Sequence, residues 1–207
     1  MRPANLRSNM SMPFTTLYTP LAGEYCLSEF GFFIIGDEWD EESLVDLKYK
    51  AGIYFLFGLQ TTEKSIEELD VIDGVIICQP NEVQQVILIY ESIILSSRTR
   101  LGLDLNDLKI PFWYTKPAKF IQISAIAPSE SDRLERASNH IMSQISEGLS
   151  VDYIILSFES DRNLSIAEYS ELSTVVESSF TDDAEVFYNL RYVDRADFCW
   201  MGIIYAA

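Results

Sequence analysis

The stretch Gly74-Val75-Ile76-Ile77-Cys78-Gln79-Pro80-Asn81, with the residues that follow it to Thr99, decides the fold of this chain. Its first part is a short run of β-branched residues between a glycine and a proline, which is typical of a buried strand. After it, apolar residues recur with helical spacing at Val83, Val86, Ile87, Tyr90, Ile93 and Ile94. Asn81 is the expected N-cap of this helix. Because the apolar stripe is wide, we expect the helix to lie between two packed layers.

The chain before this stretch predicts further buried strands and short helices. Strands are expected at Phe32–Ile35 and Ile53–Phe57, each beside a glycine. Asp37–Glu42 is acidic and suits the first turn of a helix through Leu47, because acids are favourable at helix N-termini. A short helix is expected over Thr62–Leu69. Together these elements predict a β-α-β N-terminal part.

The chain after Pro117 alternates strands and helices regularly. Glu130–Glu147 is expected to be a helix, and a second helix begins at Ser165, where Ser165 and Glu168 form a capping box. The expected strands are Phe120–Ile126, Val151–Phe158, Glu185–Tyr192 and Phe198–Tyr205. The order β-α-β-α-β-β predicts a two-layer domain, so the fold class is α/β (α+β) with a long central helix that joins two parts.

The composition is that of a globular protein. The 207 residues are 48% hydrophobic and 23% charged, as in chains that bury a core. No apolar run approaches the roughly 20 residues that span a bilayer, and the N-terminus does not resemble a signal peptide. Cys26, Cys78 and Cys199 each stand alone in an apolar neighbourhood, which favours buried free thiols in a reducing cytosol over disulfides or zinc. We therefore expect a cytoplasmic protein that contacts no membrane.

The charge is strongly acidic and uneven. A formal net charge of −17 disfavours nucleic-acid binding, because that binding depends on neutralising phosphates with Lys and Arg. The segment 98–119 is the exception, with five basic residues (Arg98, Arg100, Lys109, Lys116 and Lys119) against Asp104 and Asp107. An electropositive island in an acidic chain is a candidate partner surface.

Motifs for nucleotide hydrolysis are missing from the sequence. The nine glycines are scattered, and none lies within four residues of another. Gly31 and Gly36 have a spacing like that of a phosphate loop, but the acids Asp37 and Glu38 follow where Lys and Ser or Thr belong. No GxSxG or HExxH motif occurs, and His140 is the only histidine. We therefore expect no catalytic residue, no metal ligand and no cofactor.

Two local clusters remain as candidates for function. The segment Leu103–Leu108 carries Asp104 and Asp107, which could polarise a water or hold Mg²⁺, or could simply cap a turn before Pro111. The aromatic cluster Phe112-Trp113-Tyr114 could close the core or form a protein interface, since interfaces favour rigid aromatics beside basic residues.

From about Ser65 onward the chain resembles FtsZ, the bacterial relative of tubulin, in shortened form. Gly74–Asn81 is similar to a late strand and Pro-Asn turn of the nucleotide domain, and Asn81–Thr99 to the long core helix. Leu103-Asp104-Leu105-Asn106-Asp107 resembles the synergy loop, Asn-Leu-Asp-Phe-Ala-Asp, whose aspartates help to hydrolyse GTP on the neighbouring subunit. The tail matches the second domain in order, including Ser131-Asp132-Arg133 and Leu164-Ser165. The family's glycine-rich phosphate loop is absent, Gly102 replaces the loop's usual Asn, and Pro111 shortens the next helix.

This resemblance implies a division into three parts. Residues 1–80 are expected to be a truncated nucleotide-domain remnant, 81–100 the connecting helix and 101–207 an FtsZ-like C-terminal domain. It also implies a pseudo-GTPase linked to cell division that docks on an FtsZ-type filament subunit. The docking residues would be Asp104, Asp107, Arg98, Arg100, Lys109, Phe112, Trp113 and Tyr114.

Two alternatives stay open at this point. The same loop and aromatic cluster could face another copy of the chain, in a self-associating structural protein. Less favoured is an enzyme that uses Asp104 and Asp107, or the pair Asp182-Asp183, on a small substrate or Mg²⁺.

Overall fold

The computed structural model describes residues 14–20, 24–36, 38–63, 70–99, 117–125, 130–145, 149–161, 164–180, 184–195 and 198–206. Within this part the chain has eight strands, four α-helices and one 3₁₀ helix, η1. The strands are β1 (Thr15–Tyr18), β2 (Phe30–Ile34), β3 (Phe55–Gln60), β4 (Gly74–Ile77), β5 (Ala118–Ala125), β6 (Tyr153–Ser160), β7 (Glu185–Tyr192) and β8 (Cys199–Ala206). The helices are α1 (Glu41–Lys50), η1 (Pro80–Glu82), α2 (Val83–Thr99), α4 (Glu130–Met142) and α5 (Ile166–Ser178).

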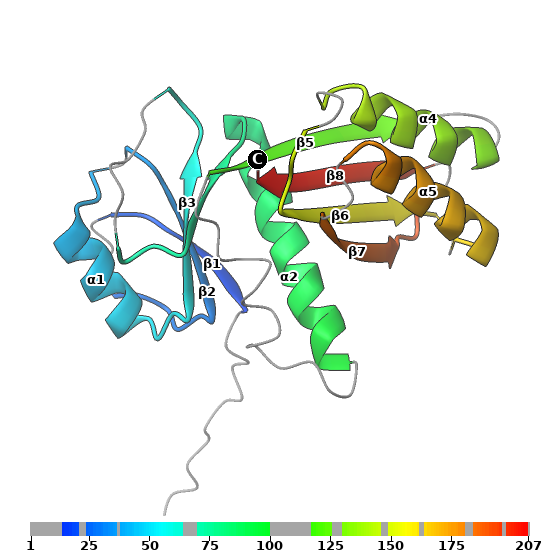
Figure 1. The fold of residues 1–207 in the computed structure, drawn as a ribbon. Coiled ribbons are helices and arrows are strands. Elements are labelled where there is room, and N and C mark those ends of the chain that lie inside the picture. Colours follow the sequence, from blue (N-terminus) through cyan, green and yellow to red (C-terminus); the bar gives the residue numbers. More distant parts are fainter. Residues whose placement is uncertain are drawn as a thin grey trace, which may run out of the picture.

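The eight strands form one mixed sheet in the order β1-β2-β3-β4-β5-β8-β6-β7. The strands β1 to β4 are parallel, β8 runs antiparallel to both β5 and β6, and β7 is parallel to β6. The ladder between β4 and β5, which joins the two halves of the sheet, has two residue pairs, Ile76 with Ala118 and Ile77 with Lys119. Figure 1 shows the two halves on either side of α2. The predicted α/β (α+β) class with its long central helix is confirmed.

The N-terminal half follows the expected strand-helix pattern with shifted boundaries. Asp40 caps α1, so the helix begins at Glu41, later than the expected acidic start at Asp37. The strand β1 was not predicted, because its four residues contain no apolar run; it pairs with β2, and its Tyr18 is buried in the core. The predicted helix at 62–69 lies almost entirely outside the described residues.

The helix α2 contributes to the core of both halves. Tyr90 is fully buried against Phe32 and Phe57, with ring centroids 5.3 Å and 5.1 Å away. The same cluster includes Trp200 and Ile204 from β8. The helix therefore packs against both halves of one continuous sheet, whereas two packed layers were expected around it. The expected cap at Asn81 is wrong, because Asn81 lies inside η1 and the Gln79 backbone N–H donates to Glu82 Oε2 at 2.8 Å.

The C-terminal half has the predicted order β-α-β-α-β-β. The helices α4 and α5 cover one face of its sheet and α2 contacts the other (Figure 1). The capping box is confirmed, since the Ser165 backbone N–H donates to Glu168 Oε2 at 2.9 Å. The helix α4 ends at Met142, five residues before the expected Glu147, because its last backbone bonds tighten to Ile141 and Met142. In the described part of the chain, no helix has both the length and the apolar character needed to cross a membrane.

A buried polar cluster fixes α2 to the far side of this sheet. Asn189 Nδ2 on β7 donates to Ser92 Oγ on α2 at 2.5 Å and to Ser157 Oγ on β6 at 2.9 Å. All three side chains are buried, and the Ser92 hydroxyl donates in turn to the Ile89 carbonyl at 2.8 Å. A single asparagine therefore joins α2, β6 and β7.

Replacing Asn189 with Ala is expected to lower the free energy of unfolding by roughly 1–3 kcal/mol, because two buried hydroxyls lose a partner. Urea denaturation followed by circular dichroism measures the change. The matched control is Asn139→Ala on the exposed side of α4, which should change stability by less than about 0.5 kcal/mol. Equal effects of the two variants would contradict the role given to Asn189.

Candidate functional site

The residues predicted to bind a partner fall outside the described part of the chain. These are Asp104, Asp107, Arg100, Lys109, Phe112, Trp113 and Tyr114. The acidic pair Asp182-Asp183, named for the alternative enzyme hypothesis, also lies outside the described residues. Arg98 belongs to the last turn of α2, but its side chain is not among those described. The residues between Arg100 and Tyr114 follow α2 in the sequence. His140 lies exposed near the end of α4.

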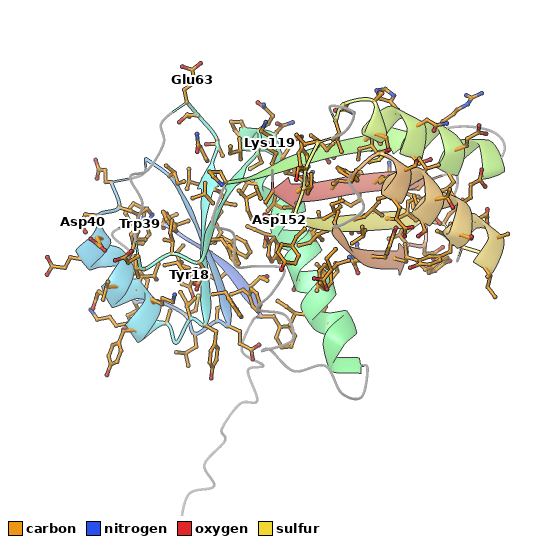
Figure 2. The ribbon with its side chains drawn as sticks, viewed as in Figure 1. Tyr18, Trp39, Asp40, Glu63, Lys119 and Asp152 are labelled. Carbon is orange, nitrogen blue, oxygen red and sulfur yellow. The ribbon has the colours of Figure 1, made fainter. Side chains whose placement is uncertain are left out.

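The carboxyl ends of the parallel strands are the first place to look for a ligand site in an α/β sheet. At the end of β2 the chain turns through Gly36 and Glu38, whose φ angles of 98° and 60° are both left-handed. Trp39 then packs edge-to-face on Phe33, with ring centroids 6.0 Å apart. Figure 2 shows Trp39 and Asp40 together at the start of α1, and Glu63 beyond the end of β3.

The N-terminus of α1 is occupied by its own side chains. Ser43 N donates to Asp40 Oδ1 at 2.8 Å, and Asp40 N donates to Ser43 Oγ at 3.0 Å. The Ser43 hydroxyl, followed by the Ser43 backbone N–H, lowers the pKa of the Asp40 carboxyl, which favours its charged form. Glu41 and Glu42 add two more acids to the first turn. A helix N-terminus with this charge and these bonds is a poor site for phosphate.

The end of β4 adds a buried thiol to this edge. Cys78 is buried, and burial, followed by the nearby Glu82 carboxylate, raises its pKa to about 11. Such a thiol is a weak nucleophile at neutral pH. Among the described residues, no group of three or more His, Cys, Asp or Glu side chains is placed to hold a metal ion.

A cavity of about 300 Å³ lies between α2 and the C-terminal half of the sheet. Trp200 Nε1 donates to Gln122 Oε1 at 2.8 Å, and Gln122 Nε2 donates to Glu82 Oε1 at 3.1 Å, so a hydrogen-bond chain links β8, β5 and η1. The lining residues are Gln85, Leu88, Ile89, Gln122, Ser124, Ser157, Glu159, Arg195, Phe198 and Trp200. The sequence analysis did not identify this cavity. The sequence feature that could have indicated the cavity is the alternation of polar with apolar residues in β5 and β6.

The sequence matches no protein-family model and no curated protein. Solved structures do match in fold. An FtsZ dimer without ligand from M. jannaschii is 11% identical, with a TM-score of 0.57 over 87% of this chain and 63% of that one. CetZ2 from Haloferax volcanii, a protofilament with GTPγS bound, is 10% identical with a TM-score of 0.54 over 86% of this chain and 64% of its own. CetZ1 from the same organism, a monomer with GDP bound, is 10% identical, with a TM-score of 0.52 over 85% of this chain and 64% of its own.

The chain therefore has the fold of FtsZ and CetZ, the tubulin-like fold, and the predicted resemblance is confirmed at that level. It spans slightly less than two thirds of the length of these structures. At this identity the likeness concerns the fold alone. Function has to be argued from the chain's own residues.

The reactivity of the three thiols tests the burial of Cys78 at the end of β4. The predicted burial of the three thiols is wrong for Cys26, which is exposed. At about pH 8, iodoacetamide is therefore expected to label Cys26, while Cys78 and Cys199 stay unmodified until the protein is unfolded. Peptide mass spectrometry measures the modified fraction at each position.

Because the pKa of Cys78 is raised from 9.0 to about 11, the folded state holds this proton more tightly than the unfolded state. Stability should therefore fall as the pH rises from 9 toward 11. Rapid native labelling of Cys78 would contradict this burial.

Proposed function

We propose that this protein is a non-GTPase, FtsZ-like binding protein that docks on an FtsZ- or tubulin-type subunit through the segment 103–108 and modulates filament assembly. One observation carries the proposal: an FtsZ-type fold whose helix start after β2 is capped by its own Asp40 and lined with acids. The chain shares the fold of FtsZ and CetZ subunits, and the acids at this edge disfavour the nucleotide.

Electrostatics support the loss of nucleotide binding. Phosphate binding at a helix N-terminus needs free backbone N–H groups and a positive local potential. In α1 the Ser43 N–H already bonds Asp40, and the acids near it are Glu38, Asp40, Glu41 and Glu42. An added polyphosphate would meet these negative charges without a compensating cation from α1's first turn.

The position of the loop supports a docking role. The segment 103–108 begins a few residues after α2, and α2 is held by the core of both halves of the sheet. A rigid helix is a precise base for a binding loop. Arg98, Arg100 and Lys109 place positive charge near Asp104 and Asp107 in sequence, and Phe112, Trp113 and Tyr114 add aromatic side chains of the kind that dominate interface energies.

Sedimentation of an assembling FtsZ from the same cell tests the docking. Adding the protein is expected to change the pelleted polymer and the GTP turnover at substoichiometric ratios, as an agent acting on filament ends would. The double variant Asp104→Ala with Asp107→Ala should lose most of this effect. The matched control replaces two exposed acids, Glu135→Ala with Glu171→Ala, and should keep it. No change at equimolar protein, with none in the pellet, would refute docking.

A thermal-shift titration tests the loss of GTP binding. Millimolar GTP with Mg²⁺ is expected to leave the Tm unchanged, whereas a ligand at 100 times its Kd would stabilise the fold by about 2.7 kcal/mol. The assembling FtsZ serves as the positive control in the same buffer. A clear rise in Tm of this protein with GTP, and not with ATP, would overturn the pseudo-GTPase assignment.

Self-association is the second candidate. It is favoured by the fact that the solved structures of this fold include an FtsZ dimer and a CetZ2 protofilament. An assembly state that rises with protein concentration, without any added partner, would support it.

A further inference from the structure

Among the described strands, β7 forms one edge of the sheet. It is the last strand in the sheet order, and no other strand among the described residues pairs with its outer side. It is eight residues long and contains no proline. The opposite edge strand, β1, has only four residues. Proteins usually protect a long edge with a proline, a bulge or a cover, since an open edge templates pairing with another strand.

The backbone of β7 shows which groups face outward. Glu185 N donates to the Asp152 carbonyl on the β6 side at 3.1 Å, and Val193 N donates to the Ser160 carbonyl at 2.8 Å. Odd-numbered residues therefore bond inward to β6. Because backbone groups alternate along a strand, the N–H and C=O groups of Val186, Tyr188, Leu190 and Tyr192 point to the open side.

One face beside this edge exposes apolar side chains. Tyr188 is covered by α5, since its hydroxyl bonds Ser173 at 3.2 Å and its ring lies 5.3 Å from that of Tyr169. Further along the same face, Leu190 is 40% exposed and Tyr192 is 53% exposed. A partner that continues the sheet would cover both.

The other face has an overhang made by α2. The helix crosses the sheet from Glu82, whose carboxylate bonds Gln122 of β5, to Ser92, which bonds Asn189 of β7. The turns after Ser92 therefore run beyond β7, as Figure 1 shows for the lower end of α2. Leu95 lies three residues after Ser92, on the same side of the helix, and is 46% exposed. It would pack on a sheet that continued past β7.

We propose that a second copy of this chain pairs its β7 with this β7, antiparallel and about a two-fold axis perpendicular to the sheet. In an antiparallel pair, opposite residues point to the same face of the sheet. The two-fold axis must therefore pass beside one residue that lies opposite its own copy, and the register is named after that residue. Centring on Tyr188 places Glu185 opposite Arg191 of the second copy and Val186 opposite Leu190. Centring on Asn189 places Arg191 opposite Phe187 and Glu185 opposite Val193, so no opposite charges meet across the contact. Arg191 already forms an ion pair with Glu159 of its own chain at 2.7 Å, and the register centred on Tyr188 places the second copy's Glu185 beside that pair. Charge complementarity therefore selects Tyr188.

This register also matches shape and hydrogen bonding. Tyr192 falls opposite Ala184, a large residue beside a small one, and the outward-facing groups of Val186, Tyr188 and Leu190 all find partners. The contact is isologous, so it closes as a dimer and does not propagate into a filament. The contact uses no residue of the segment 103–108, so it is independent of the docking proposed above.

The association state of the full chain is the first test. Sedimentation velocity without any FtsZ, at about 0.15 M salt to screen the charge of the two acidic copies, should show a concentration-dependent dimer. Leu190→Lys places a charge at the centre of the contact and should shift the chain to monomer. Ile166→Lys, at a 91% exposed position on α5, should leave the dimer intact. A monomeric wild-type chain at all concentrations, or equal behaviour of the two well-folded variants, would overturn the proposal.

Disulfide trapping tests the register. In a Cys26→Ser background, Glu185→Cys and Arg191→Cys are prepared as separate chains, and both positions are exposed. Opposite residues in a non-hydrogen-bonded pair have Cα atoms about 4.5 Å apart, which a disulfide can span. Mild oxidation should cross-link an equimolar mixture of the two chains and neither chain alone. Cross-linking of one chain alone, or none in the mixture while the dimer persists, would contradict the register centred on Tyr188.

Discussion

The structure depends on the packing of α2 against both halves of the sheet. Tyr90 contacts the phenylalanine rings of β2 and β3, and other residues of α2 share a core with Trp200, Ile204 and Ile155 of the C-terminal half. The ladder between β4 and β5 contributes only two residue pairs. Burial of apolar side chains of α2 against both halves therefore adds to this short ladder in fixing the halves relative to each other.

The same helix links the places where function is proposed. It leads into the segment 103–108 at one end, and at the other end η1 connects it to Gln122 through Glu82. Its last turns extend past β7, where a second copy would pack. A closed dimer would present two docking loops, and linked sites bind a filament more tightly than one site does.

The carboxyl edge of the parallel strands is closed by the chain's own side chains at the start of α1. The turn after β2 uses left-handed backbone at Gly36 and Glu38, and then the Asp40 cap satisfies the N–H of Ser43. A cap of this kind stabilises a helix by about 1 kcal/mol. The Asp40 carboxylate thus occupies a backbone N–H at the start of α1.

The sequence by itself determined the elements whose signals are local. The apolar period of α2, the Ser165 capping box and the order of the C-terminal strands follow from spacing and capping chemistry, and the structure has them. The resemblance to FtsZ rested on that order. The partner-binding residues between Arg98 and Tyr114 remain predictions.

Only the tertiary structure decided the features that join distant segments. The Asn189 side chain meets Ser92 across 97 positions of sequence, and Trp200 meets Gln122 across 78. The strand β1 exists because β2 pairs with it, and the Gln79–Glu82 bond replaces the expected cap at Asn81. Periodicity indicates which face of an element is buried, but it does not indicate which residues pack against that face. Those pairings are set by the packing of the whole chain.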